Sequence, residues 1–251
     1  MLICDDISGV IKKYQNEAHD KTHRYISFDY CYNYFYLNRN DLLKDIQKSC
    51  LVLGFYLASW GMYRGSSFLL NKNVKYLEET INYINTLPPE VWDIDVDNYT
   101  ETNIKTIIDI FKEVKKILIK ENARHITLVT KILLGVFGFI PAFDRYFCLS
   151  FNEIFKDEKL KGKNSKDKKP KDEKDKLKKP LEAIKRFYDS NKTEIDKLSS
   201  EIFTYDFVSG EKTNIIYKKA KIIDMYGFEK GKEIDQILAL NNKTPKPIEP
   251  Q

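Results

Sequence analysis

Two residues in the middle of the chain have the types and spacing for chemistry at the bond between a sugar and a base. Lys131 lies near the start of an apolar helical segment, and Asp144 follows thirteen residues later, directly after a break at Gly138 and Pro141. A helix, a turn and a second helix of this length can bring the two side chains together. A lysine can attack the sugar C1′, and a fixed carboxylate stabilises an oxocarbenium-like transition state. Lys131 and Asp144 are therefore the candidate catalytic pair.

Each residue also has an ordinary structural explanation. An aspartate after a proline-containing turn is commonly a helix N-cap. A single lysine on an apolar helix commonly extends its ammonium to solvent. Only the combination of Lys131 with Asp144 favours a catalytic interpretation.

The stretch from Thr130 to Phe147 resembles the signature region of the helix-hairpin-helix DNA glycosylases, in particular the lysine-bearing 8-oxoguanine glycosylase branch. The similarity lies in Lys131, the apolar helix that contains it, and the sequence Pro141-Ala142-Phe143-Asp144. In that family the lysine follows the hairpin, and the aspartate opens a later helix. The resemblance implies that Lys131 is a Schiff-base nucleophile, that Asp144 is the catalytic carboxylate, and that the fold is an all-α, multi-helix body.

The segment SWGMYRGSSFLL holds further candidates for substrate binding. Trp60, Tyr63 and Arg64 fall within one or two helical turns of each other. Aromatic rings stack on extruded bases, and arginine binds phosphate. Arg145, next to Asp144, is a second candidate for a phosphate contact. Core packing for Trp60 and an ion pair for Arg145 are the alternatives.

A tyrosine-rich run, FDYCYNYFYLNRN, precedes these segments. If it is extended, its tyrosines form one aromatic face that suits base stacking. Tyr32 and Tyr34 are therefore additional candidates for substrate binding. Packing in the core is the alternative for both.

Helical periodicity dominates the rest of the chain. Apolar residues recur every three or four positions in several segments, which predicts amphipathic helices. The expected helices cover approximately residues 41–59, 73–86, 100–120, 122–136, a segment from near 144, 181–202 and 213–224.

The composition divides the chain into four parts. Residues 1–155 form the expected helical body with the candidate site, and 181–240 form a C-terminal helical part packed on it. Residues 156–180 are rich in lysine and poor in apolar residues, so we expect a disordered insert. Residues 241–251 are an expected disordered tail.

The net charge of +5 is concentrated in the expected insert. Residues 156–180 contain twelve lysines and six acidic residues, so they carry +6 and leave the rest at about −1. A DNA-binding surface on the body must therefore be a local patch, or must include the insert.

Several function classes have no motif in this sequence. His19 and His23 have the spacing of metal ligands but lack a third ligand. The four cysteines lie far apart, as in reduced thiols of a cytoplasmic protein. No apolar run reaches the length of a membrane span, and P-loop, dinucleotide and Ser-His-Asp motifs are absent. We expect a cytoplasmic monomer that binds no metal and no cofactor and does not contact membrane.

The expected function is that of a DNA glycosylase. It would extrude a damaged or modified base from double-stranded DNA and excise it. Base-excision repair and defence against phage DNA with modified bases are both compatible with this chemistry. The alternative is a non-catalytic helical protein that binds nucleic acid or another partner.

Overall fold

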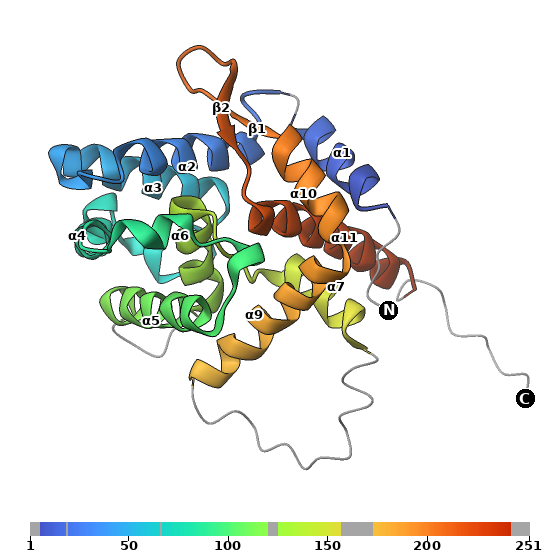
Figure 1. The fold of residues 1–251 in the computed structure, drawn as a ribbon. Helices are drawn as coiled ribbons and strands as arrows, with labels where there is room; N and C mark the ends of the chain where they lie inside the picture. Colours follow the sequence, from blue (N-terminus) through green and yellow to red (C-terminus); the bar gives the residue numbers. More distant parts are fainter. Residues whose placement is uncertain (1–5, 19, 66, 120–124, 157–172, 242–251) are drawn as a thin grey trace, which may run out of the picture.

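A computed structural model of the chain describes residues 6–18, 20–65, 67–119, 125–156 and 173–241. The described residues are mostly helical, and a single two-stranded antiparallel sheet accompanies the helices (Figure 1). The predicted all-α class is therefore confirmed. None of the helices in this part of the chain has the length and apolar character needed to cross a membrane.

The α-helices and strands follow one another in chain order. They are α1 (Ile7–Glu17), α2 (Ser27–Asn38), α3 (Ile46–Ser59), α4 (Glu78–Asn85), α5 (Glu101–Leu118), α6 (Ile126–Phe137), α7 (Arg145–Ile154), α9 (Glu173–Ser190), α10 (Lys192–Glu201), β1 (Phe203–Tyr205), β2 (Lys212–Ile216) and α11 (Lys219–Asn241). Short 3-10 helices lie between them. These are η1 (Arg24–Ile26), η2 (Leu42–Asp45), η3 (Phe68–Asn71), η4 (Val74–Leu77), η5 (Pro89–Asp93) and η6 (Val96–Asn98).

Helix α5 shows how directly the apolar pattern determines an element. Thr100 caps it by accepting a hydrogen bond from the Asn103 N–H. Ile107, Phe111 and Val114, spaced by four and three residues, are buried on one face. The prediction of a helix over 100–120 is confirmed, because a single apolar stripe can be buried only in this conformation.

Two segments differ from the predicted pattern. The region predicted as a helix over 213–224 starts as strand β2, and α11 begins only at Lys219. The Thr-Asn-Ile-Ile stretch 213–216 includes β-branched residues, which suit a strand, and β2 pairs with β1. Conversely, the tyrosine-rich run forms helix α2 rather than an extended strand.

The C-terminal part of the expected disordered insert is helical instead. Helix α9 begins at Glu173, so residues 173–180 are helical, with Pro180 inside the helix. Leu177, Leu181 and Ile184 follow helical spacing and are buried, which explains why the helix extends into a lysine-rich sequence. Residues 157–172 and the predicted tail from 242 lie outside the described residues.

Helix α6 lies at the centre of the arrangement, with α2 and α3 on one side and α5 on the other (Figure 1). Every residue from Leu128 to Phe137 is buried. The approach of α3 is close, because a side chain at Gly135 would meet the ring of Tyr56 at 2.4 Å. The candidate lysine therefore belongs to the most enclosed helix of the body.

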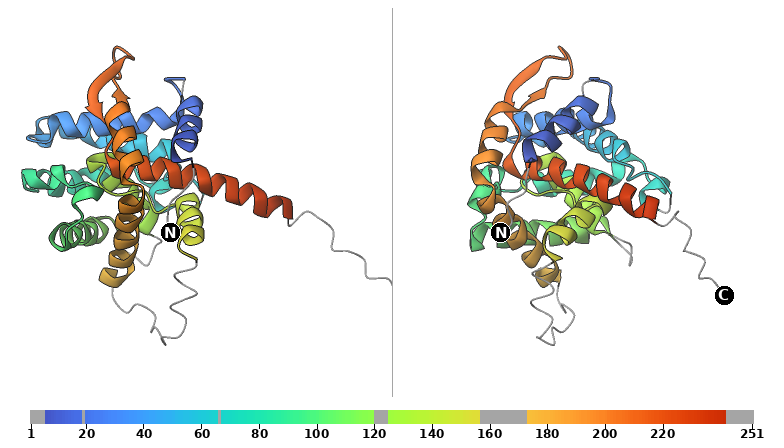
Figure 2. Two further views of the ribbon diagram at one scale, coloured as in Figure 1. Left: turned by 45° about the vertical axis from the view of Figure 1, so that its right-hand side comes forward. Right: turned by 90° about the vertical axis from the view of Figure 1, so that its right-hand side faces the viewer.

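Helix α11 packs against α7, α1 and α10, and its C-terminal end extends beyond the other helices (Figure 2). Gly227 and Gly231, four residues apart, face α7. A Cβ atom at Gly231 would lie 1.9 Å from the carbonyl oxygen of Tyr146. The two helices can approach this closely only because glycine has no side chain.

Candidate functional site

The central feature is an ion pair between the two residues singled out by the sequence. Lys131 Nζ lies 3.2 Å from Asp144 Oδ2. The Lys131 side chain is 5% exposed and that of Asp144 is 15% exposed. Most of this pair is therefore shielded from water, and Asp144 is its more accessible member.

The turn between α6 and α7 determines this geometry. Gly138 ends α6 in the left-handed region, with φ of 69°. Thr130 Oγ1 accepts a hydrogen bond from the Phe143 N–H at 2.9 Å, and Thr127 Oγ1 donates to the Phe143 carbonyl at 2.9 Å. Asp144 then caps α7, because its Oδ1 accepts from the Phe147 N–H at 3.0 Å. One oxygen of Asp144 therefore holds the helix, and the other contacts the lysine.

A second buried lysine–aspartate pair supports the same turn from α11. Lys221 Nζ lies 2.8 Å from Asp224 Oδ2, and Lys221 is 1% exposed. The other oxygen of Asp224 accepts a hydrogen bond from the Ala142 N–H at 2.9 Å. Helix α11 therefore fixes the backbone two residues before Asp144.

An aromatic group lies between the two ion pairs. The Trp60 ring centroid is 4.8 Å from Lys131 Nζ and 5.7 Å from Lys221 Nζ. Tyr25 stacks on Trp60 with centroids 5.5 Å apart, and Phe228 meets it edge-on at 5.6 Å. Trp60 is only 9% exposed, and its indole N–H has no hydrogen-bond partner among the described residues. In this conformation the ring packs against protein groups.

A buried carboxylate, that of Glu229, contacts the Tyr25 hydroxyl of this aromatic group. Glu229 is fully buried, and its Oε1 accepts hydrogen bonds from Lys232 at 3.1 Å and from the Tyr25 hydroxyl at 3.4 Å. Burial raises the pKa of Glu229 above its usual value, and burial also raises the pKa of Tyr25, to about 12. Lys232 also binds Glu17 at 2.8 Å. Glu17, Glu229 and Lys232 therefore all contact the Tyr25 hydroxyl.

The other basic and aromatic candidates have separate environments. Tyr63 is half-buried, and Arg64 is exposed with its guanidinium folded over Gly61. Arg145 is exposed and forms an ion pair with Asp235 of α11. Arg145 thus lies beside Asp144 in the chain but is engaged with another helix.

The two candidate tyrosines of α2 are not brought to the ion pair. Tyr32 is buried, stacks on Phe28, and lies beside Gly138, about two helical turns from Lys131 along α6. The Tyr34 hydroxyl lies 2.9 Å from Ser49 Oγ. The tyrosines do not form one extended aromatic face, because the run is helical and the helix turns successive tyrosines in different directions.

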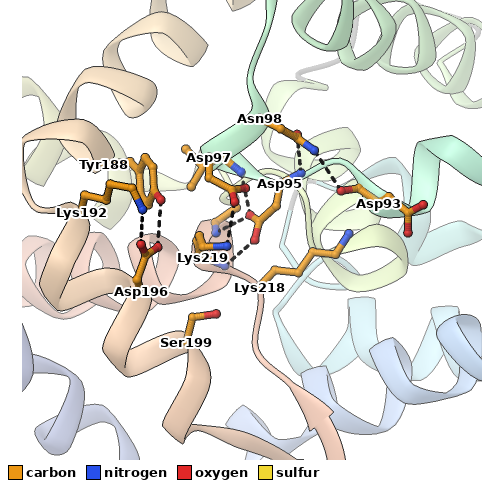
Figure 3. Close-up of polar contacts among 12 residues, drawn as sticks. Asp93, Asp95, Asp97, Asn98, Tyr188, Lys192, Asp196, Ser199, Lys218 and Lys219 are labelled. Carbon is orange, nitrogen blue, oxygen red and sulfur yellow. Dashed lines mark hydrogen bonds and ion pairs between the residues drawn. The ribbon is translucent and has the colours of Figure 1, made fainter.

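A polar cluster holds the start of α11 (Figure 3). The carboxylate of Asp95 accepts hydrogen bonds from the backbone N–H groups of Lys219 and Ala220, at 2.8 and 2.9 Å. Lys218 Nζ donates to the carbonyls of Trp92 and Ile94, at 2.5 and 2.9 Å. Burial lowers the pKa of Lys218 to about 8. This cluster positions α11, and so indirectly Asp224.

Within the described residues, no group of three His, Cys, Asp or Glu side chains could hold a metal ion. His19 lies outside the described residues, and the ring of His23 accepts a hydrogen bond from the Tyr25 N–H. Cys31 and Cys50 are buried, and Cys148 is exposed.

Sequence reasoning missed Lys221 and Asp224. Their spacing of three residues places both on one face of a helix, but the surrounding sequence gives no sign that this face meets the α6–α7 turn. Tyr25 and Glu229 were missed for the same reason, since they are 204 residues apart in the chain.

The fold and the site define a helical protein with a buried lysine–aspartate pair between two consecutive helices. Comparison of the chain with protein-family models, curated proteins and solved structures finds no match. The segment before Lys131 reads ITLVT and lacks the glycines with which the hairpins of the helix-hairpin-helix glycosylases bind phosphate. Only the chemistry of the residues themselves therefore indicates a function.

Proposed function

We propose that this protein is a DNA glycosylase that excises a damaged or modified base through Lys131 and Asp144. The supporting observation is the contact of 3.2 Å between Lys131 Nζ and Asp144 Oδ2 in a site largely shielded from water. A low-dielectric environment strengthens the electrostatic effect of a fixed carboxylate on a developing sugar cation.

The proposed reaction transfers the sugar from the base to the lysine. The bond between C1′ and the base nitrogen breaks, and its electron pair leaves with the base. Asp144 stabilises the positive charge that develops at C1′. The proton lost by the Lys131 ammonium passes to the departing base, and the Nζ lone pair then bonds to C1′. The resulting amine opens the sugar ring to a Schiff base, from which β-elimination can cleave the strand.

The cap geometry supports the role of Asp144. Its Oδ1 is held by the Phe147 N–H, so the orientation of the carboxylate does not depend on the lysine. The positive end of the α7 dipole also interacts favourably with a negative charge at this position. The carboxylate is therefore preorganised before substrate arrives.

The exposure of the pair determines how a nucleotide must approach. Lys131 is covered by Trp60 on one side, whereas Asp144 is partly open. We infer that the sugar enters from the Asp144 side and that Trp60 must shift for C1′ to reach Nζ. An extruded base could then stack on the rings of Trp60 or Tyr63, while Arg64 binds a phosphate and Arg145 binds another after leaving Asp235.

The proposed substrate is double-stranded DNA with one weakened pair. Extruding a nucleotide costs a few kcal/mol of stacking and pairing, which favours lesions and bulky modifications over intact bases. Damaged bases in cellular DNA and protective modified bases in phage DNA are both substrates of this kind. We propose that the protein acts as a cytoplasmic monomer without a cofactor.

The burial of the pair also favours a second candidate, a non-catalytic nucleic-acid-binding or interaction protein. In that case Lys131 and Asp144 only join α6 to α7, and Trp60 is part of the core. Binding would then survive changes at both residues and would depend on the lysine-rich region instead.

The decisive experiment measures abasic-site formation. The purified protein is incubated with ordinary DNA, DNA with oxidised or alkylated bases, and phage DNA with modified bases, and the strands are then treated with alkali. We expect breaks in one substrate class. Asp144→Asn should lower the excision rate by about 100-fold or more. Borohydride should trap a covalent protein–DNA adduct that Lys131→Gln does not form.

The matched control is Asp189→Asn, which removes an exposed ion pair with Lys185 within α9. This control should retain excision and trapping. Absence of breaks in all substrates, or equal loss in the control, would exclude Lys131 and Asp144 as a catalytic pair.

A further inference from the structure

Arg24, in η1, has an unusual position for a surface arginine. Its side chain is exposed, yet its guanidinium carbon lies 5.4 Å from the ring centroids of both Tyr25 and Trp60. Stacking on rings holds the planar group in place and leaves its N–H edge available for hydrogen bonds.

The charge of Arg24 is not neutralised by a carboxylate in the described part of the chain, where it makes no ion pair. The acidic residues nearest to Tyr25 are already engaged, because Lys232 binds both Glu17 and Glu229. Arg145, by contrast, is paired with Asp235. The Arg24 guanidinium is therefore exposed, is held in place by two rings, and has no anionic partner among the described residues.

Its location relates it to the candidate site. The Trp60 ring lies 5.4 Å from the Arg24 guanidinium carbon and 4.8 Å from Lys131 Nζ, so the two cations lie within about 10 Å of each other. A nucleotide whose C1′ approaches Lys131 carries phosphodiesters on both sides of its sugar. One of these phosphates can therefore lie within reach of the long Arg24 side chain.

We propose that Arg24 binds a phosphodiester of the strand that carries the extruded nucleotide. When Trp60 shifts to admit the sugar, the contact of Arg24 with the Tyr25 ring remains. A stacked guanidinium offers two parallel N–H groups to two phosphate oxygens, a geometry that lysine cannot provide. This role rests on the proposed function for the position of the sugar, but the phosphate contact itself is a binding property. It adds a contact from the N-terminal part of the chain, at a residue that no sequence motif indicates.

The test measures binding rather than excision. A fluorescent duplex with one tetrahydrofuran abasic analogue is titrated with protein by anisotropy between 50 and 200 mM salt. Loss of one phosphate contact should reduce the slope of log K against log salt by roughly 0.7 to 0.9. We expect this reduction for Arg24→Gln, with affinity roughly ten-fold weaker. Arg24→Lys should keep most of the salt slope and lose part of the affinity.

Arg39→Gln is the matched control, because Arg39 also lies over a tyrosine ring, at 4.4 Å from Tyr36, at the end of α2. It should bind like the unchanged protein. Thermal unfolding monitored by circular dichroism verifies that each variant is folded. An unchanged slope for folded Arg24→Gln, an equal effect of Arg39→Gln, or no measurable duplex binding by the unchanged protein would overturn the proposal.

The outcomes separate this inference from the proposed chemistry. If the protein excises a base but Arg24→Gln leaves the slope of log K against log salt unchanged, the proposed phosphate contact is refuted and the proposed glycosylase activity stands. If binding depends on Arg24 but neither excision nor borohydride trapping occurs, the phosphate contact stands and the glycosylase activity is refuted.

Discussion

At the scale of single residues, Lys131 and Asp144 illustrate the cost of burying charge. Taking two ions out of water is compensated only by their mutual attraction and by further hydrogen bonds. Asp144 has such a bond from the Phe147 N–H, and Lys131 has the ring of Trp60. The pair is therefore stable only while both partners are present.

Removing one partner should destabilise the protein more than removing both charges. Asp144→Asn leaves a buried ammonium without a counter-charge, and we expect it to lower the free energy of unfolding by about 3 kcal/mol. Lys131→Met combined with Asp144→Asn should recover about 2 kcal/mol of this loss, since asparagine still caps α7. Urea unfolding of the two single variants and the double variant tests this, and additive effects would contradict it.

Asp29 predicts a pH dependence of stability. It is fully buried, accepts hydrogen bonds from the Tyr217 hydroxyl and the Tyr205 N–H, and has its pKa raised by burial to about 7. As pH rises from about 4 to 7, the unfolded chain releases this proton while the folded protein retains it. The contribution of Asp29 to stability is therefore greatest at low pH and is lost as pH approaches and passes 7.

Asp29→Asn should remove this dependence. The difference in unfolding free energy between the variant and the unchanged protein should shift in favour of the variant by roughly 2 to 4 kcal/mol between pH 4 and pH 8. Chemical unfolding at several pH values measures the difference. A difference that is constant across this range would show that Asp29 keeps an ordinary pKa in the fold.

At the scale of elements, the close contact between α7 and α11 is the most sensitive to volume. Any side chain at Gly231 meets backbone atoms of Tyr146, which cannot move aside as a flexible side chain can. Gly231→Ala should lower stability by about 3 kcal/mol, the upper end for overpacking. Gln236→Ala, on the exposed part of the same helix, is the control and should change stability little. Thermal unfolding compares them, and equal melting temperatures would contradict the close contact.

The contact between α7 and α11 also affects the candidate site. Helix α11 provides Asp224, which holds the Ala142 N–H, and α7 begins with the Asp144 cap. Separating the two helices should therefore also displace the carboxylate. We expect Gly231→Ala to reduce the excision activity by a larger factor than it reduces the fraction of folded protein.

At the scale of the whole molecule, charge is distributed unevenly. Residues 157–172, outside the described part of the chain, contain seven lysines and four acidic residues. Replacing these seven lysines with glutamine should weaken binding to any polyanion and flatten its salt dependence, because fewer counterions are released. Thermal stability should not change. Anisotropy titrations with duplex DNA at several salt concentrations measure the effect.

This replacement also distinguishes the two candidate functions. A glycosylase should retain its excision rate at saturating protein and low salt. A binding module should lose most of its affinity. Loss of excision under saturating conditions would instead indicate that the lysines act within the site.

The sequence by itself determined the helical class and much of the candidate pair. Periodic apolar residues predicted α5, and the Gly138 and Pro141 break predicted a new helix capped by Asp144. These features are local, since each depends on residues within a few turns of chain. For the same reason, the sequence alone indicated that Lys131 and Asp144 lie close together.

Only the tertiary structure decided what surrounds the pair. The Trp60 ring, the Lys221–Asp224 clamp on Ala142 and the stacked Arg24 come from segments more than 35 residues away from Lys131 in the chain. The α2 helix and the β1–β2 hairpin were likewise decided by packing, because aromatic and β-branched residues suit either conformation until a partner surface selects one. Contacts between distant segments depend on how helices pack, and single-chain periodicity carries no information about which faces meet.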